Sequence, residues 1–226
     1  MLKKMLIMAR HIIYGVCCFV VGLNSAQAVI IAGDVTGGSA ATAGGIFIKL
    51  IPPIGDVGDD NFNDPNLYGF DEDQNIIIPA PLTVDIGPSA TLPTGTEVAS
   101  HYVVFDPASS QRMIGYVDFD APILAIMTKT ATLAASDFLA NVSANYLSPS
   151  ARGLESADSV AIDPVLTHRA LINFTASSPG DSIRILTAFS PGGEPDPTPM
   201  PVPGGLGLML LGLCLLLQRQ LKYAPH

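Results

Sequence analysis

The chain has 226 residues, of which 48% are hydrophobic and only 14% are charged. All 20 acidic residues lie between Asp34 and Asp196, and this stretch holds only 6 of the 11 basic residues, which leaves it with a net charge of −14. Such a surface repels a phosphate backbone, so the charge balance argues against nucleic acid as a partner.

Glycine, proline and cysteine narrow the class of protein further. The chain has 21 Gly and 19 Pro, two residue types that helix interiors tolerate poorly. This composition favours short strands joined by turns. The three cysteines, Cys17, Cys18 and Cys214, lie in the two terminal apolar runs. The stretch between them therefore has no disulfide framework and no thiolate metal site.

Residues 1–28 have the pattern of a secretory signal peptide. Three basic residues fall among the first ten, and an apolar run follows at 12–23. A membrane-spanning helix needs about 20 residues, so this run is too short to be one. Ala26 and Ala28 have the spacing that signal peptidase accepts. We therefore predict passage through the Sec translocon and cleavage after Ala28; a retained amphipathic or membrane helix is the alternative.

Residues 29–191 form the predicted folded body, which consists of a succession of short strands. Several segments alternate apolar with polar side chains, and turn residues separate them at short intervals. The predicted strands are 29–36, 44–51, 82–86, 97–106, 112–120, 122–128, 158–162, 168–176 and 181–190. This spacing predicts an all-β fold, a β-sandwich for which a jelly roll is one form.

Two segments of the body support more specific predictions. The strand at 181–190 has apolar residues on both faces, which places it in the middle of one of two packed sheets. The segment 132–147 departs from the strand pattern, and Ser136 followed by Asp137 offers a helix start. We predict one short helix from Ser136 to Val142 that covers an open end of the sandwich.

The segment 55–75 is the richest in polar side chains and is predicted to be a loop. Calcium takes six to eight oxygen ligands, which Asp and Asn side chains in flexible loops can supply. The candidate calcium ligands are Asp56, Asp59, Asp60, Asp71 and Asp73. Neither the EF-hand register nor the glycine- and aspartate-rich nonapeptide is present. The alternative is a solvated loop whose Asp and Asn side chains cap turns; a bound ion would be structural, tying the loop to the sandwich.

The sequence predicts no catalytic residue and, apart from calcium, no cofactor. His101 and His168 lie in predicted strands without a partner at metal-ligand spacing, and no Gly-x-Ser-x-Gly motif occurs. Two acids of a glycosidase need only meet in space, so a secreted glycan hydrolase stays an alternative. The aromatic residues that could stack on sugars, or else fill the core, are Tyr68, Phe70, Tyr102, Tyr116 and Tyr146.

The C-terminus has the layout of a spacer and an anchor. Residues 192–203 alternate proline with other residues, which predicts a stiff extended spacer. The predicted anchor, 204–226, begins with a wholly apolar stretch that ends at Leu217, and Arg219 and Lys222 follow. Positive charge beside an apolar segment favours the cytoplasmic side. We predict a short transmembrane sorting helix that resides in the inner membrane in transit; an ordinary single-span C-terminal anchor is the alternative.

The tail sequence "PVPGGLGLMLLGL", with its sorting motif at Pro201, Val202 and Pro203, resembles the Val-Pro variant of the PEP-CTERM sorting tails. The body segments "DNFNDPNLYGFDEDQN", "HYVVFDPASS", "LAASDFLA" and "RGLESADSV" are similar to domains of proteins exported with such tails. The resemblance implies a Gram-negative bacterium and an exosortase-like membrane transpeptidase that processes the tail. It implies delivery to the cell surface or to extracellular polysaccharide, and the group has no well-defined biochemical activity to carry over to this chain.

We therefore expect an exported, non-enzymatic protein of the cell surface or of an extracellular matrix such as a biofilm. The alternatives are a carbohydrate-binding module, which would hold matrix polysaccharide through the 55–75 loop and nearby aromatic rings, and the secreted glycan hydrolase.

Overall fold

The computed structural model describes residues 29–189 of the chain. These residues form mostly β-strands in several sheets, with short helices between them, so the all-β prediction is confirmed. No helix within this range is long and apolar enough to cross a membrane. The predicted signal peptide, spacer and sorting helix lie outside the described residues.

The first sheet has four antiparallel strands in the order β1-β9-β13-β12. Their bounds are β1 Ile30–Gly37, β9 Gln111–Phe119, β13 Arg169–Ala176 and β12 Ser159–Ile162. Strands β9 and β13 pair over eight residues without a break. The β1–β9 ladder has register shifts after Ile30 and after Val35.

The second sheet has six strands, five of them in the order β10-β14-β8-β4-β2, and β5 pairs with the start of β8. Their bounds are β10 Ile123–Met127, β14 Asp181–Ala188, β8 Glu97–Phe105, β4 Leu67–Asp71, β2 Phe47–Lys49 and β5 Ile76–Ile77. All pairs are antiparallel except β2 with β4, which is parallel.

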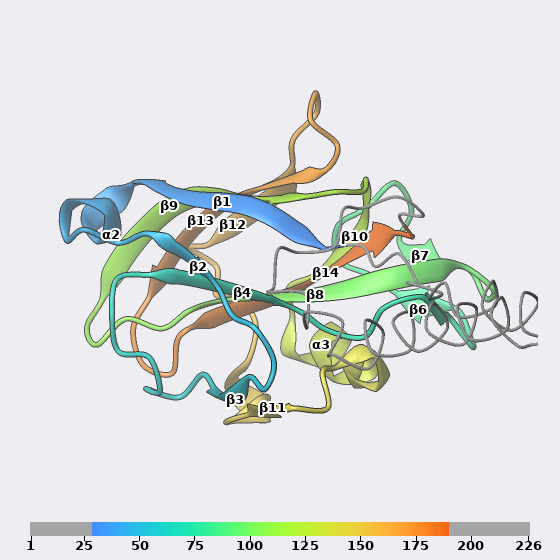
Figure 1. Ribbon diagram of the computed structural model, residues 1–226, viewed down its shortest axis with the longest axis horizontal. Helices are drawn as coiled ribbons and strands as arrows, with labels where there is room; N and C mark the ends of the chain where they lie inside the picture. Colours follow the sequence, from blue (N-terminus) through green and yellow to red (C-terminus); the bar gives the residue numbers. More distant parts are fainter. Residues whose placement is uncertain (1–28, 190–226) are drawn as a thin grey trace, which may run out of the picture. The chain divides into compact units, whose positions relative to one another are not determined.

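The two sheets face each other across one hydrophobic cluster, to which both contribute (Figure 1). Alternation decides which side chains enter it. On β13, Ala170, Ile172 and Phe174 are buried, whereas Leu171 is 39% exposed. On β14, Ile183 and Ile185 join this cluster, while Leu186 packs into a second cluster on the other face. Strand β14 thus lies inside its sheet with both faces covered, as predicted.

The second hydrophobic cluster lies on the outer face of the six-stranded sheet, under a layer of short elements (Figure 1). This covering layer contains two strand pairs and three short helical turns. Its elements are β3 Gly55–Val57, β11 Ala144–Tyr146, β6 Leu82–Thr83, β7 Thr91–Leu92, α3 Thr130–Ala135, and the 3-10 turns η1 Asp137–Leu139 and η2 Pro149–Ala151. Strands β3 and β11 pair in parallel, although 86 residues, Gly58 to Ser143, lie between them in the chain.

The helix predicted at Ser136–Val142 is displaced: the α-helix is α3, and only the turn η1 falls in the predicted range. A carboxylate from a distant segment holds the two residues that precede α3. The carboxylate of Asp85 accepts the backbone N–H groups of Thr128 (2.8 Å) and Lys129 (3.1 Å) and the hydroxyl of Thr132. Burial alone would raise the pKa of Asp85, but the side chain of Lys129, whose Nζ lies 2.9 Å from Oδ1, and these bonds lower it to about 2. A second short helix, α2 (Gly38–Thr42), follows β1 and was not predicted.

The predicted loop 55–75 is wrong at its start, where β3 lies, and in its second half, which contains strand β4. Leu67 and Phe70 are fully buried, and β4 pairs with both β2 and β8. Acidic and amide residues on either side hide this five-residue strand in the sequence. Its position is important for function, because its last residue, Asp71, and the following Glu72 each begin a buried polar cluster.

Candidate functional site

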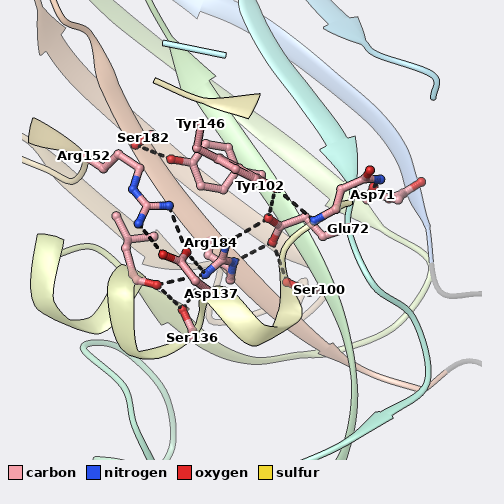
Figure 2. Close-up of polar contacts among 12 residues, drawn as sticks. Asp71, Glu72, Ser100, Tyr102, Ser136, Asp137, Tyr146, Arg152, Ser182 and Arg184 are labelled. Carbon is pink, nitrogen blue, oxygen red and sulfur yellow. Dashed lines mark hydrogen bonds and ion pairs between the residues drawn. The ribbon is translucent and has the colours of Figure 1, made fainter. Parts of the chain in front are cut away.

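The outer face of the six-stranded sheet contains a fully buried ion pair between Glu72 and Arg184 (Figure 2). Arg184 on β14 donates from Nε to Glu72 Oε2 at 2.6 Å and from Nη2 to Oε1 at 2.9 Å. Ser100 of β8 donates to Oε2 at 2.6 Å, and the hydroxyl of Tyr146 donates to Oε1. Burial and the charge of Glu72 raise the pKa of Tyr146, which therefore stays a neutral donor.

The same arginine holds the covering layer. Arg184 Nη1 donates to the carbonyl of Leu133 (3.0 Å), to Ser136 Oγ (2.7 Å) and to Asp137 Oδ1 (3.2 Å). Arg152, just after η2, makes a two-pronged pair with the carboxylate of Asp137 at 2.9 and 2.7 Å. Burial opposes the charge of Arg184, but Glu72 outweighs it and raises the pKa of the guanidinium. One permanent charge thus joins β4 and β14 to α3 and η1.

The inner face of the six-stranded sheet contains a second polar cluster, in which an acid, an imidazole and a hydroxyl follow one another. His101 of β8 contacts Asp71 Oδ1 through Nδ1 at 2.7 Å and Thr187 Oγ1 through Nε2 at 3.0 Å. Hydrolases use this order to activate a nucleophile. Here His101 and Thr187 are both 0% exposed, and the ring of Phe119 packs against the imidazole with centroids 4.7 Å apart. A substrate cannot reach this hydroxyl in the folded protein.

Asp71 instead ties three strands together. Its Oδ1 accepts the backbone N–H of Ile30 at 3.0 Å, and its Oδ2 pairs with Lys49 Nζ at 3.0 Å. Burial alone would raise the pKa of Asp71, but the hydrogen bond and charge of His101, followed by the charge of Lys49, lower it. The carboxylate therefore links β1 of one sheet to β2 and β8 of the other.

The five candidate calcium ligands do not converge on one site. Asp56 lies on β3, where its Oδ1 accepts a bond from Asn145 Nδ2 at 2.7 Å. Asp59 Oδ2 accepts the hydroxyl of Ser148 at 2.7 Å. These two bonds join the loop to the segment around β11.

The other three candidates point to different places. Asp60 has a left-handed backbone, with φ at 64°. Asp71 belongs to the inner cluster, and Asp73 follows Glu72, where burial and the charge of Glu72 raise its pKa. Strand β4 separates Asp71 and Asp73 from the first acidic residues. Across residues 29–189, no group of three or more Asp, Glu, His or Cys side chains has a geometry that could hold a metal ion.

The first half of the loop is instead organised by Asp106, a residue that the sequence analysis passed over at the end of a strand. Asp106 is fully buried, and its Oδ2 accepts the backbone N–H of Phe62 at 3.1 Å. Burial raises its pKa although backbone N–H groups from the loop oppose this. Asp64 caps its own turn by accepting the N–H of Asn66 at 2.9 Å. Side chains capping turns are what the alternative to calcium predicted.

Most of the candidate sugar-stacking rings are used inside the protein. Phe70 and Tyr102 are buried in the second cluster, and Tyr68 is buried and stacks on Phe62 with centroids 4.0 Å apart. Tyr116 lies on the outer face of the four-stranded sheet, but the guanidinium of Arg169 covers its ring at 3.9 Å. The fifth ring, that of Tyr146, is partly buried and packs edge-on against Tyr102.

Asp181, the first residue of β14, gives the protein a pH-dependent stability. Burial, then the charges of Asp158 and Glu155, raise its pKa to about 7, and its Oδ2 is buried without a hydrogen-bond partner in the described part of the chain. The folded protein keeps a proton that the unfolded chain releases near a pH of about 4. The free energy of unfolding therefore falls as the pH rises between these two values.

We expect Asp181→Asn to remove this slope and to be more stable than wild type at pH 8, by up to about 4 kcal/mol. Urea unfolding from pH 4 to 8 measures the effect, with the exposed Asp34→Asn as the matched control. Parallel pH profiles for Asp181→Asn and wild type would contradict the assignment.

Arg184 and Glu72 are the functional residues that sequence reasoning missed, and one signal was present. An arginine between Ile183 and Ile185, on a strand predicted to be covered on both faces, requires a buried acid. Which of the 20 acids it pairs with depends on the strand order. The predicted cleavage residues Ala26 and Ala28 and the sorting motif Pro201, Val202 and Pro203 lie outside the described residues.

Comparison of the chain with protein-family models, with curated proteins and with solved structures found no match.

Proposed function

We propose that the chain is an exported, non-enzymatic protein of the cell surface or extracellular matrix of a Gram-negative bacterium. Its body, residues 29–191, is a β-sandwich with an additional covering layer. The signal peptide directs it through the Sec translocon, and an exosortase-like transpeptidase recognises the tail at Pro201, Val202 and Pro203. This function rests on the sequence of the two ends and on how the body uses its reactive groups.

The observation that carries the non-enzymatic part is the burial of the best-formed polar constellations. His101, Thr187 and Arg184 are all 0% exposed. Each has its polar atoms bonded to groups on other strands or on the covering layer. Groups that could do chemistry at a surface are used here as internal ties between layers. A body built in this way supports a scaffold role.

Two properties of the body suit a location outside the cytoplasm. Residues 29–189 contain no cysteine, so their stability does not depend on the redox state of the compartment. The high negative charge keeps an exported domain soluble. The aromatic candidates for a polysaccharide site are largely occupied by protein contacts. Retention of polysaccharide is therefore the alternative function and not the main proposal. A pull-down with matrix polysaccharide tests it.

Fractionation of cells tests the proposed delivery. The chain is expressed in a Gram-negative host that has a tail-processing transpeptidase, once as wild type and once with Pro201, Val202 and Pro203 replaced by alanine. We expect wild type at the surface or in the medium and the variant in the inner membrane. Replacing Pro195 and Pro197 of the spacer by alanine is the control, and we expect it to behave as wild type. Equal distribution of wild type and the motif variant would contradict the proposal.

A further inference from the structure

The start of the first strand is held by carboxylates at two consecutive residues. The backbone N–H of Val29 donates to Asp120 Oδ1 at 2.8 Å, and the N–H of Ile30 donates to Asp71 Oδ1 at 3.0 Å. The backbone N–H of Asp120 in turn donates to the carbonyl of Val29 at 3.1 Å. Asp120 follows β9 directly, so this residue both ends the β1–β9 ladder and binds the chain at Val29.

The carboxylate of Asp120 is only half used by this contact. Its Oδ2 is buried and has no hydrogen-bond partner within residues 29–189. A buried carboxylate oxygen without a donor costs free energy, because the charged group has lost its water. A peptide N–H at Val29 supplies one donor and no charge, so it cannot complete the site.

Cleavage after Ala28 would supply what this carboxylate lacks. Hydrolysis of the Ala28–Val29 peptide bond adds one water molecule, leaving a carboxylate on Ala28 and an amine on Val29. The amine takes up a proton at neutral pH, because the ordinary pKa of an α-amino group is about 8. The product has three N–H donors and a positive charge at the atom that already donates to Oδ1.

We propose that Asp120 is the binding site for the α-ammonium group of Val29, and that removal of residues 1–28 completes the fold by forming this ion pair. The inference rests on the proposed cleavage after Ala28 and extends it. It gives the export signal a second effect: the body reaches its full stability only after processing, on the far side of the membrane.

The neighbouring charges are compatible with an added ammonium group. On the elements packed against this end of β1, the charged groups include Asp120, Asp71 with its partners Lys49 and His101, and Asp118 of β9, which pairs with Arg169. Lys49 Nζ also donates to the carbonyl of Ile30 at 3.0 Å.

A thermodynamic cycle on the full chain tests the ion pair. Precursor 1–226 is purified in detergent, a sample is treated with signal peptidase, and the Tm of both forms is measured for wild type, Asp120→Asn and Asp34→Asn. Asp34 is exposed on β1 and controls for loss of a carboxylate on the same strand. We expect processing to raise Tm by about 3 to 8 °C more in wild type and Asp34→Asn than in Asp120→Asn. The same change in all three would overturn the proposal.

A second measurement keeps the test independent of how well Asp120→Asn folds. In processed wild-type protein, the pKa of the Val29 amine is followed by ¹⁵N NMR, and we expect it above the ordinary value because a carboxylate stabilises the ammonium form. A pKa at or below about 8 would overturn the ion pair.

The same samples separate this inference from the proposed function. Intact mass shows where signal peptidase cuts, and a first residue other than Val29 contradicts the cleavage prediction. In that case the ion pair is measured on a chain cut directly before Val29 by a site-specific protease, because this cut releases the same amine. Its Tm difference and amine pKa support or overturn the role of Asp120 whatever the cleavage result.

Discussion

Glu72→Gln lowers the free energy of unfolding by about 3–5 kcal/mol, because it leaves the guanidinium of Arg184 charged and buried without its acid. Both side chains are 0% exposed, and the two bonds between them are 2.6 and 2.9 Å long. A guanidinium is not deprotonated in proteins, so the arginine does not escape the penalty by losing its proton. Urea unfolding followed by circular dichroism measures the loss.

A matched control and a double variant separate the buried pair from general effects of removing an acid. Glu97→Gln makes the same chemical change at an exposed position of β8, and we expect a change within about 0.5 kcal/mol. Arg184→Met combined with Glu72→Gln removes both charges and should recover part of the loss. Equal stability of Glu72→Gln and Glu97→Gln would contradict the structural role of the network.

Asp71→Ala has the second largest expected effect, a loss of about 2–4 kcal/mol. It leaves His101 Nδ1 buried without a partner and removes the contacts to Ile30 and Lys49 that link the two sheets. Because the folded-state pKa of Asp71 is lowered, its stabilising contribution is present above the ordinary carboxyl pKa and is lost as the pH falls through the lowered value.

Urea unfolding at pH 7 and at pH 3 checks both parts of this prediction. We expect a large difference between Asp71→Ala and wild type at pH 7 and a smaller one at pH 3. Asp34→Ala serves as the exposed control on β1. A difference that does not change with pH would show that Asp71 acts through packing and not through its charge.

Most long strands could be predicted because the alternation of apolar and polar residues within each of them already indicates a strand. Alternation located β8, β9, β13 and β14 to within two residues at each end. Strand β4 was missed because its five residues stand among Asp and Asn, and only the neighbouring strands β2 and β8 make it a strand. Helix α3 was misplaced because the residues before it are held by the carboxylate of Asp85, which comes from a segment more than forty residues earlier.

The polar clusters could not be predicted from the sequence, because their members meet only through the strand order. Asp71 and Glu72 are adjacent in the chain and serve opposite faces of the same sheet. The composition of the segment 55–75 identifies Asp71 and Glu72 only as two members of an acidic loop. The partners of these two acids, His101 and Arg184, come from β8 and β14, 30 and 112 residues away. The spacing of residues along the chain does not show which of them will pair in the fold.

Intact mass of the protein recovered from the cell surface tests the account most directly, because it fixes both ends of the mature chain in one measurement. We predict a product that begins at Val29 and lacks the apolar segment after Pro203, and we expect loss of that segment to require the exosortase-like transpeptidase. Recovery of the whole chain, Met1 to His226, from the cytosol would contradict the account.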